Sequence, residues 1–191
     1  MRRRRTCQKF KSRGSNAAET SASLRAARNA DKQVYQSDDT NEYNLAVLDD
    51  PIETVEKLAP WTFNVHFKDM AMEECESGFL LSEVPLGEGM LDMPRITETI
   101  RRARPDVRFS LEMIVRDPLL VPCLTDRFWA SFDDVNGIHL ARALSRIRIR
   151  TSRRGGALPR ITGLDPDQRL ALEHELVDRS IKYAARHLGL G

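Results

Sequence analysis

The 191-residue sequence has little cysteine and no long apolar run. Its three cysteines are odd in number, far apart and form no Cys-x-x-Cys pair, so they do not predict a disulfide framework or a zinc site of that type. No segment approaches the roughly 18 apolar residues of a membrane span. The charged start has no apolar segment after it, unlike a secretory signal. We therefore expect an intracellular, cytoplasmic protein that does not associate with membranes.

Charge is unevenly distributed along the chain, although the formal net charge is only +2. Residues 1–33 contain ten lysines and arginines against two acidic residues, a net charge of +8, so the other 158 residues carry −6. This tail holds only two large apolar residues, Phe10 and Leu24, and we expect it to be disordered. A basic arm can bind nucleic acid, but this one offers little aromatic surface for base stacking, and nucleic acid is not the expected partner.

Strand and helix patterns alternate from residue 34 onward, which predicts one α/β domain over residues 34–191. Trp61 to Asp69 alternates apolar and polar residues with a period of two, as a strand does. Asp50-Pro51 and Asp92 are typical helix starts. About three parallel strands are expected, too few to close a barrel. The expected strands are 34–41, 61–69 and 107–115, and the expected helices between them are 51–59 and 93–104.

The remaining segments are expected to surround these strands. Gly87-Glu88-Gly89 interrupts regular structure, so we expect residues 70–91 to form a long loop that shapes a substrate pocket. Helices over about 137–149 and 165–188 would form a C-terminal helical extension. The aromatic residues before them have two open interpretations, since they can cover a pocket and stack on a sugar or pack in the core. These aromatic residues are Phe128, Trp129 and Phe132.

Three residues carry the expected chemistry. His66 and Lys68 are two positions apart and project to the same side near the end of a strand. Glu112 lies inside an apolar strand, where a carboxylate is costly unless it is paired, protonated or metal-bound. One interpretation is a mixed nitrogen and oxygen site for Mn, Mg, Co or Zn. The other is an ion pair of Glu112 with Lys68 or an arginine. Lys68 itself would hold a substrate oxygen or phosphate, or would pair with Asp69 or Glu112.

Several short motifs occur in an order that resembles a known family. The three main ones, with Asp92 after the second, resemble the last third of the sugar phosphate isomerase/epimerase family, the xylose isomerase-like TIM barrels. The resemblance covers about residues 38–190 and implies a partial (β/α)8 TIM barrel. The main motifs are His66-Phe67-Lys68-Asp69, Pro85-Leu86-Gly87-Glu88-Gly89 and Ser110-Leu111-Glu112, and weaker ones are Leu48-Asp49-Asp50-Pro51, Pro122-Cys123-Leu124-Thr125, Phe128-Trp129-Ala130 and Leu158-Pro159-Arg160.

The resemblance implies a divalent metal held by a Glu, an Asp, a His and a second Glu from four consecutive strands. His66 matches the His and Glu112 the last Glu. The Asp falls on Asp39 with a one-residue shift in the motif, and Asp38 is the alternative. No residue matches the first Glu. The resemblance further implies catalytic roles for Glu112 and Lys68. It implies substrate binding by Lys68, Glu88 and Trp129.

In that family the metal polarises a ketose carbonyl and its adjacent hydroxyl, and two glutamates move the proton through an enediolate. Only Glu112 is matched here, so we expect a truncated chain that is weakly active or inactive on a sugar or sugar phosphate. Unpaired strand edges would favour self-association. One alternative is a non-catalytic remnant or binding module of the same fold. Another is a nucleic-acid protein similar to the AP endonucleases.

Overall fold

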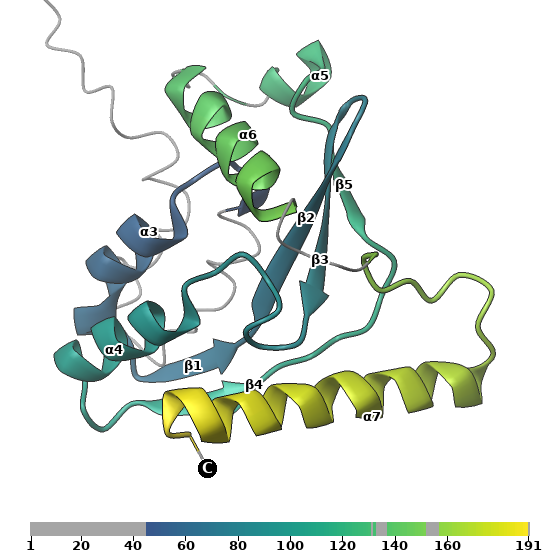
Figure 1. The fold of residues 1–191 in the computed structure, drawn as a ribbon. Helices are drawn as coiled ribbons and strands as arrows, with labels where there is room; N and C mark the ends of the chain where they lie inside the picture. The colour runs from purple at the N-terminus through teal and green to yellow at the C-terminus, as the bar shows by residue number, and fades with distance from the viewer. Residues whose placement is uncertain (1–44, 131, 133–136, 152–156, 191) are drawn as a thin grey trace, which may run out of the picture.

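The computed structural model describes residues 45–130, 132, 137–151 and 157–190 (Figure 1). These residues form a mixed α/β arrangement with one parallel strand pair, a second antiparallel sheet and surrounding helices, and within them no barrel closes. The 1–33 tail, the expected strand at 34–41 and the candidate ligands Asp38 and Asp39 lie outside the described residues. In the part of the chain that the structure describes, no helix is long and apolar enough to cross a membrane.

The predicted helix starts are confirmed by their capping contacts. Helix α3 (Pro51–Leu58) follows Asp50, whose Oδ1 accepts hydrogen bonds from the backbone N–H groups of Ile52 at 2.9 Å and Glu53 at 3.3 Å. Helix α4 (Met93–Ala103) is capped by Asp92 and buries Ile96 and Ile100. Helix α3 is followed directly by a short 3₁₀ turn, η1 (Ala59–Trp61), because Pro60 prevents the α-helix from continuing.

Strands β1 (Asn64–Phe67) and β4 (Arg108–Leu111) pair in parallel, and α4 lies on the connection between them. The register sets His66 beside Ser110 and Phe67 beside Leu111. Both strands are shorter than predicted. The first strand begins at Asn64 because η1 precedes it, and this leaves Trp61 and Phe63 exposed. Glu112 follows β4 directly rather than lying in the middle of a strand.

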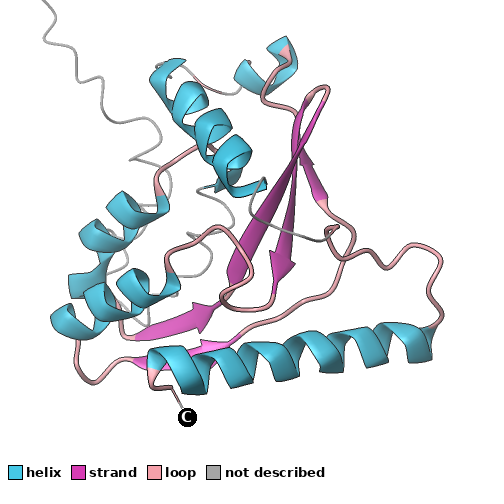
Figure 2. Ribbon diagram, viewed as in Figure 1, coloured by secondary structure: helices cyan, strands magenta, loops and turns pink. Residues whose placement is uncertain are grey.

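The predicted loop over residues 70–91 is wrong for most of its length. Strands β2 (Asp69–Cys75) and β3 (Gly78–Val84) form an antiparallel hairpin, and β5 (Leu119–Val121) adds to β3 in the same antiparallel sense (Figure 2). Phe79, Leu81 and Val84 supply apolar surface that the core buries. The hairpin was missed because its turn, Glu76-Ser77, lacks the Asn-Gly or Asp-Gly signal of common two-residue turns.

The C-terminal helices match the prediction more closely. After α5 (Asp126–Trp129), helix α6 (Gly137–Thr151) packs against the hairpin and is joined to α3 by Arg146, which binds Asp50 at 2.7 Å. Helix α7 (Pro166–Tyr183) starts with a reciprocal capping box between Asp165 and Gln168. It continues as the π-helical turn η2 (Ala184–Leu188). Arg101 of α4 donates hydrogen bonds to the carbonyl of Leu188 and to that of Gly189, the next residue.

One apolar cluster lies beneath these elements and fixes the ends of β1 and β2. Phe67 of β1 and Phe79 of β3 are fully buried in it, together with Met93 and Ile96 of α4 and Ile147 of α6. Burying side chains of this size stabilises the fold by about 1.5–3 kcal/mol each. The packed core around Phe67 therefore fixes the position of the backbone from which the next residues extend.

Candidate functional site

The ends of two neighbouring parallel strands bring the predicted histidine and glutamate together. His66 is the penultimate residue of β1, and Glu112 is the first residue after β4. The N–H of Glu112 donates to the carbonyl of Phe67 at 3.1 Å, which extends the strand pairing by one residue. In parallel α/β folds, functional side chains gather at such carboxyl ends.

Glu112 contacts both His66 and Lys68 through different oxygens. Its Oε2 lies 2.9 Å from Nδ1 of His66, and its Oε1 lies 3.4 Å from Nζ of Lys68. The exposed fractions are 30% for the His66 side chain, 26% for Glu112 and 4% for Lys68. The structure therefore assembles the three predicted residues, with the imidazole and carboxylate facing solvent and the ammonium beneath them.

A second carboxylate, which sequence reasoning missed, lies below Lys68. Glu83 of β3 has a side chain only 1% exposed, and its Oε1 lies 3.6 Å from Lys68 Nζ. The same oxygen accepts a hydrogen bond from Nη2 of Arg116 at 3.0 Å, while Oε2 accepts one from the N–H of Ile114 at 2.7 Å. A buried ammonium needs such compensation, and two carboxylates provide it. Glu83 was missed because its segment was expected to be a loop, although an acid within the apolar run Phe79 to Val84 was an available signal.

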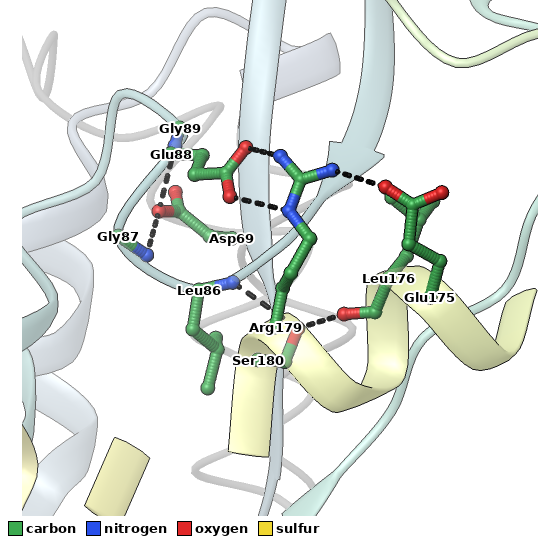
Figure 3. A network of polar contacts seen from close by, with 9 residues as sticks. All are labelled: Asp69, Leu86, Gly87, Glu88, Gly89, Glu175, Leu176, Arg179 and Ser180. Atoms are coloured by element: carbon green, nitrogen blue, oxygen red, sulfur yellow. Dashed lines mark hydrogen bonds and ion pairs between the residues drawn. The ribbon is translucent and has the colours of Figure 1, made fainter. Parts of the chain in front are cut away.

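Asp69, next to Lys68, organises the loop that connects β3 to α4 (Figure 3). Its side chain is fully buried, and its two oxygens accept four backbone hydrogen bonds at 2.8–3.2 Å. Burial raises the pKa of Asp69 to about 7, although the four N–H donors act in the opposite direction. Sequence reasoning treated Asp69 only as a partner for Lys68, and its role as a loop anchor was not expected. The donors are the N–H groups of Met70, Gly87, Gly89 and Leu91.

Glu88, predicted to bind substrate, is paired with helix α7 (Figure 3). Its carboxylate accepts hydrogen bonds from both Nε and Nη2 of Arg179, the former at 2.9 Å. The N–H of Leu86 donates to the Ser180 hydroxyl at 3.3 Å, and the Tyr183 ring packs directly over Gly87. The loop bearing Glu88 is therefore docked on α7, and a substrate contact for Glu88 stays a prediction.

Trp129 belongs to a cluster of aromatic rings. Its indole Nε1 donates to the carbonyl of Cys123 at 2.9 Å, and its ring centroid lies 5.1 Å from that of Phe128 and 5.7 Å from that of Phe132. The side chain is partly buried against the apolar core. These contacts correspond to the packing interpretation of the three aromatics, and stacking on a sugar stays a prediction.

His66 and Glu112, two of the expected metal ligands, contact each other directly. The 2.9 Å between His66 Nδ1 and Glu112 Oε2 is a hydrogen-bond distance, and adjacent ligands of an octahedral ion with bonds of about 2.1 Å also lie about 3.0 Å apart. Among the described residues, no group of three or more His, Cys, Asp or Glu side chains is placed to hold a metal. A divalent ion at His66 and Glu112 would therefore need at least one further ligand from outside the described residues, as expected for Asp39.

Comparisons with known proteins add nothing to this geometry: no family model, curated protein or solved structure matches the chain. The arrangement of His66, Lys68 and Glu112 and the order of the motifs that contain them are therefore the features from which a function can be inferred.

Proposed function

We propose that this chain is the C-terminal part of a divalent-metal-dependent sugar or sugar phosphate isomerase or epimerase. The observation that carries the proposal is the convergence of His66, Lys68 and Glu112 on adjacent parallel strand ends, with 2.9 Å between imidazole and carboxylate. Each of these residues lies in one of the motifs that resemble that family. The partial TIM barrel that the resemblance implies belongs to the same proposal.

Each side chain has a distinct part in the proposed site. His66 and Glu112 would hold the metal with Asp39, and the metal would supply a Lewis acid that acidifies the C–H bond next to a carbonyl. Glu112 would accept the proton as the substrate passes through an enediolate. Lys68, whose ammonium lies 3.4 Å from Glu112 Oε1 and whose side chain is 4% exposed, would hold that carboxylate in place. Binding of a substrate oxygen or phosphate by Lys68 stays a prediction.

A second candidate function is a non-catalytic binding module that retains the same fold. The observation favouring it is that both oxygens of Glu112 already contact side chains of the chain itself, as in a structural ion-pair network. The two candidates differ in whether a metal ion binds at His66.

Metal content per chain after dialysis tests the proposal. The wild type, His66→Ala, Asp39→Ala and the control His174→Ala would be loaded with Mn²⁺ and analysed for retained metal. His174 is an exposed residue of α7, so its loss removes an imidazole far from the strand ends in sequence. We expect near-stoichiometric metal in the wild type and His174→Ala, and strong loss in the other two. Equal retention in wild type and His66→Ala would exclude His66 as a ligand, and no retention in the wild type would favour the binding module.

Proton exchange tests the reaction itself. Metal-loaded protein would be incubated in D₂O with ketoses and ketose phosphates, and deuterium at the carbon next to the carbonyl would be followed by NMR. We expect slow incorporation by the wild type and none by Glu112→Gln, which cannot accept the proton. Equal incorporation by both proteins would exclude Glu112 as the base.

A further inference from the structure

Glu83 links the two sides of the candidate site without reaching its surface. It lies on β3 of the hairpin, while His66 and Lys68 lie at the end of β1 and Glu112 follows β4. Its side chain is 1% exposed, so it is shielded from any substrate. Any influence on the chemistry must therefore act through the groups that it contacts.

Those contacts reach both halves of the site. One Glu83 oxygen lies 3.6 Å from Lys68 Nζ, so the ammonium is shared between Glu83 and Glu112, which lies 3.4 Å away. The other oxygen accepts the N–H of Ile114, two residues after Glu112, at 2.7 Å. The Glu83 carboxylate thus contacts Lys68, which is a partner of Glu112, and also the backbone two residues after Glu112.

We propose that Glu83 is a positioning residue for the His66–Glu112 site, which shares the charge of Lys68 and fixes the segment after β4. This inference rests on the proposed function, because the site is taken to bind a divalent metal. Among the described residues, Glu112 is the other carboxylate paired with the Lys68 ammonium, so without Glu83 the ammonium attracts Glu112 more strongly and competes with His66 for it. The carboxylate then offers less negative charge to a cation.

Neutralising Glu83 and neutralising its partner Arg116 should have opposite effects on Mn²⁺ affinity. Glu83→Gln leaves Lys68 and Arg116 with one carboxylate fewer, and we expect Mn²⁺ affinity to fall about tenfold, as for other groups that support metal ligands. Arg116→Gln removes a cation that competes with Lys68 for Glu83 and repels the metal, and we expect unchanged affinity or a rise of up to about threefold. Damage to the fold would lower the affinity in both variants.

The experiment measures Mn²⁺ affinity by electron paramagnetic resonance for the full chain and three variants. The control is Glu76→Gln, which removes the same charge from an exposed position in the turn of the same hairpin, and it should bind as the wild type does. The predicted order is Glu83→Gln weakest, then wild type and Glu76→Gln, with Arg116→Gln equal or tighter. Equal affinity of Glu83→Gln and wild type, or equal losses in Glu83→Gln and Arg116→Gln, would overturn the proposal.

Amide hydrogen exchange separates this inference from the proposed function. We expect the Ile114 amide to exchange at least about tenfold faster in Glu83→Ala than in wild type, because a buried charge-assisted hydrogen bond is lost. If the wild type retains no Mn²⁺ but Ile114 loses protection in the variant, the proposed function fails, and only the part of the inference in which Glu83 fixes the segment after β4 stands. If Mn²⁺ binds while neither affinity nor exchange responds to Glu83, the positioning role fails and the proposed function stands.

Discussion

Asp69 shows how one buried carboxylate can fix a loop. Four backbone N–H groups converge on its two oxygens, and a Cβ atom at Gly89 would overlap the carboxylate, so the loop can approach only because that residue is glycine. Lys68 precedes Asp69 in the chain, so the same anchor also limits the movement of the ammonium. The loop anchor and the candidate site are therefore consecutive residues.

Burial of Asp69 predicts that the free energy of unfolding depends on pH. Its folded pKa of about 7 lies above the ordinary value of 3.8, so the folded chain retains a proton that the unfolded chain has released. This stabilisation is complete below about pH 4 and is lost as the pH rises through 7, with a slope of up to about 1.4 kcal/mol per pH unit. Urea unfolding of the wild type and Asp69→Asn from pH 4 to 8 measures the difference in slope. A wild-type free energy of unfolding that rises relative to the variant would show that the four N–H donors outweigh burial.

Asp69→Asn also has a predicted cost at constant pH. At pH 6 the Asp69 carboxyl group is mostly protonated but still has two oxygens that can accept hydrogen bonds. An amide has only one, so two of the four N–H donors would face an NH₂ group. We expect the free energy of unfolding at pH 6 to fall by about 2–4 kcal/mol, from one or two unsatisfied buried donors. The control Asp106→Asn changes an exposed carboxylate of the α4–β4 connection and should remain within about 0.5 kcal/mol of wild type. A change in Asp69→Asn as small as in this control would contradict the anchoring role.

At the scale of elements, helix α7 is joined to the Leu86–Gly89 loop by contacts of different strength. The Glu88–Arg179 pair is about 40% exposed on both sides, and solvent screens it to about 0.2–1 kcal/mol. Ser180, by contrast, is fully buried, donates to the carbonyl of Leu176 and accepts from the N–H of Leu86. Packing and the buried hydroxyl should therefore hold α7 in place more than the visible ion pair does.

A pair of glycine substitutions tests the docking of α7. Gly87 and Gly163 both have positive φ, +83° and +88°, and alanine in that region costs about 1–2 kcal/mol at either position. A Cβ at Gly87 would overlap the Tyr183 ring, whereas nothing lies within 4 Å of one at Gly163. We expect the free energy of unfolding, measured by thermal denaturation, to fall by about 3 kcal/mol or more in Gly87→Ala and by about 1 kcal/mol in Gly163→Ala. Equal losses would mean that α7 does not pack on Gly87 in solution.

At the scale of the whole molecule, the predicted parallel pairing is present between β1 and β4, and β2, β3 and β5 form an antiparallel sheet that the sequence did not predict. Among the described residues, β4 pairs only with β1 and β5 pairs only with β3, so each has an edge without a strand partner. Leu119 and Leu120 of β5 are about half exposed at one of these edges. Unpaired, apolar strand edges promote association between chains.

Sedimentation velocity over a range of concentrations tests this association. We expect the wild type to form dimers or larger species at high concentration, and Leu119→Lys to shift the distribution toward monomer. The control is Leu170→Lys, since Leu170 is similarly exposed but lies on helix α7. A monomeric wild type, or equal effects of the two lysine variants, would contradict association through the β5 edge.

Local signals in the sequence determined the helix starts and the first strand. Asp50-Pro51, Asp92 and Asp165-Pro166 each cap the helix predicted to follow them, because capping depends on side chains within three residues. Alternation identified β1 with His66 and Lys68 close to its end. Proximity of Glu112 to His66 was expected for a shared metal site, and an ion pair of Glu112 with Lys68 was the alternative interpretation. The structure shows both contacts.

Only the tertiary structure decided which distant groups neutralise the buried charges. The hairpin brings Glu83 beneath Lys68, and the β3–α4 loop turns back to place three N–H groups on Asp69. These pairings join residues 15 to 22 positions apart through a turn without a strong sequence signal. Burial of a charge is decided by the packing around it, and neither composition nor periodicity specifies which partner that packing supplies. The sequence thus determined where the polar side chains leave the strands, and the assembled fold determined what they meet.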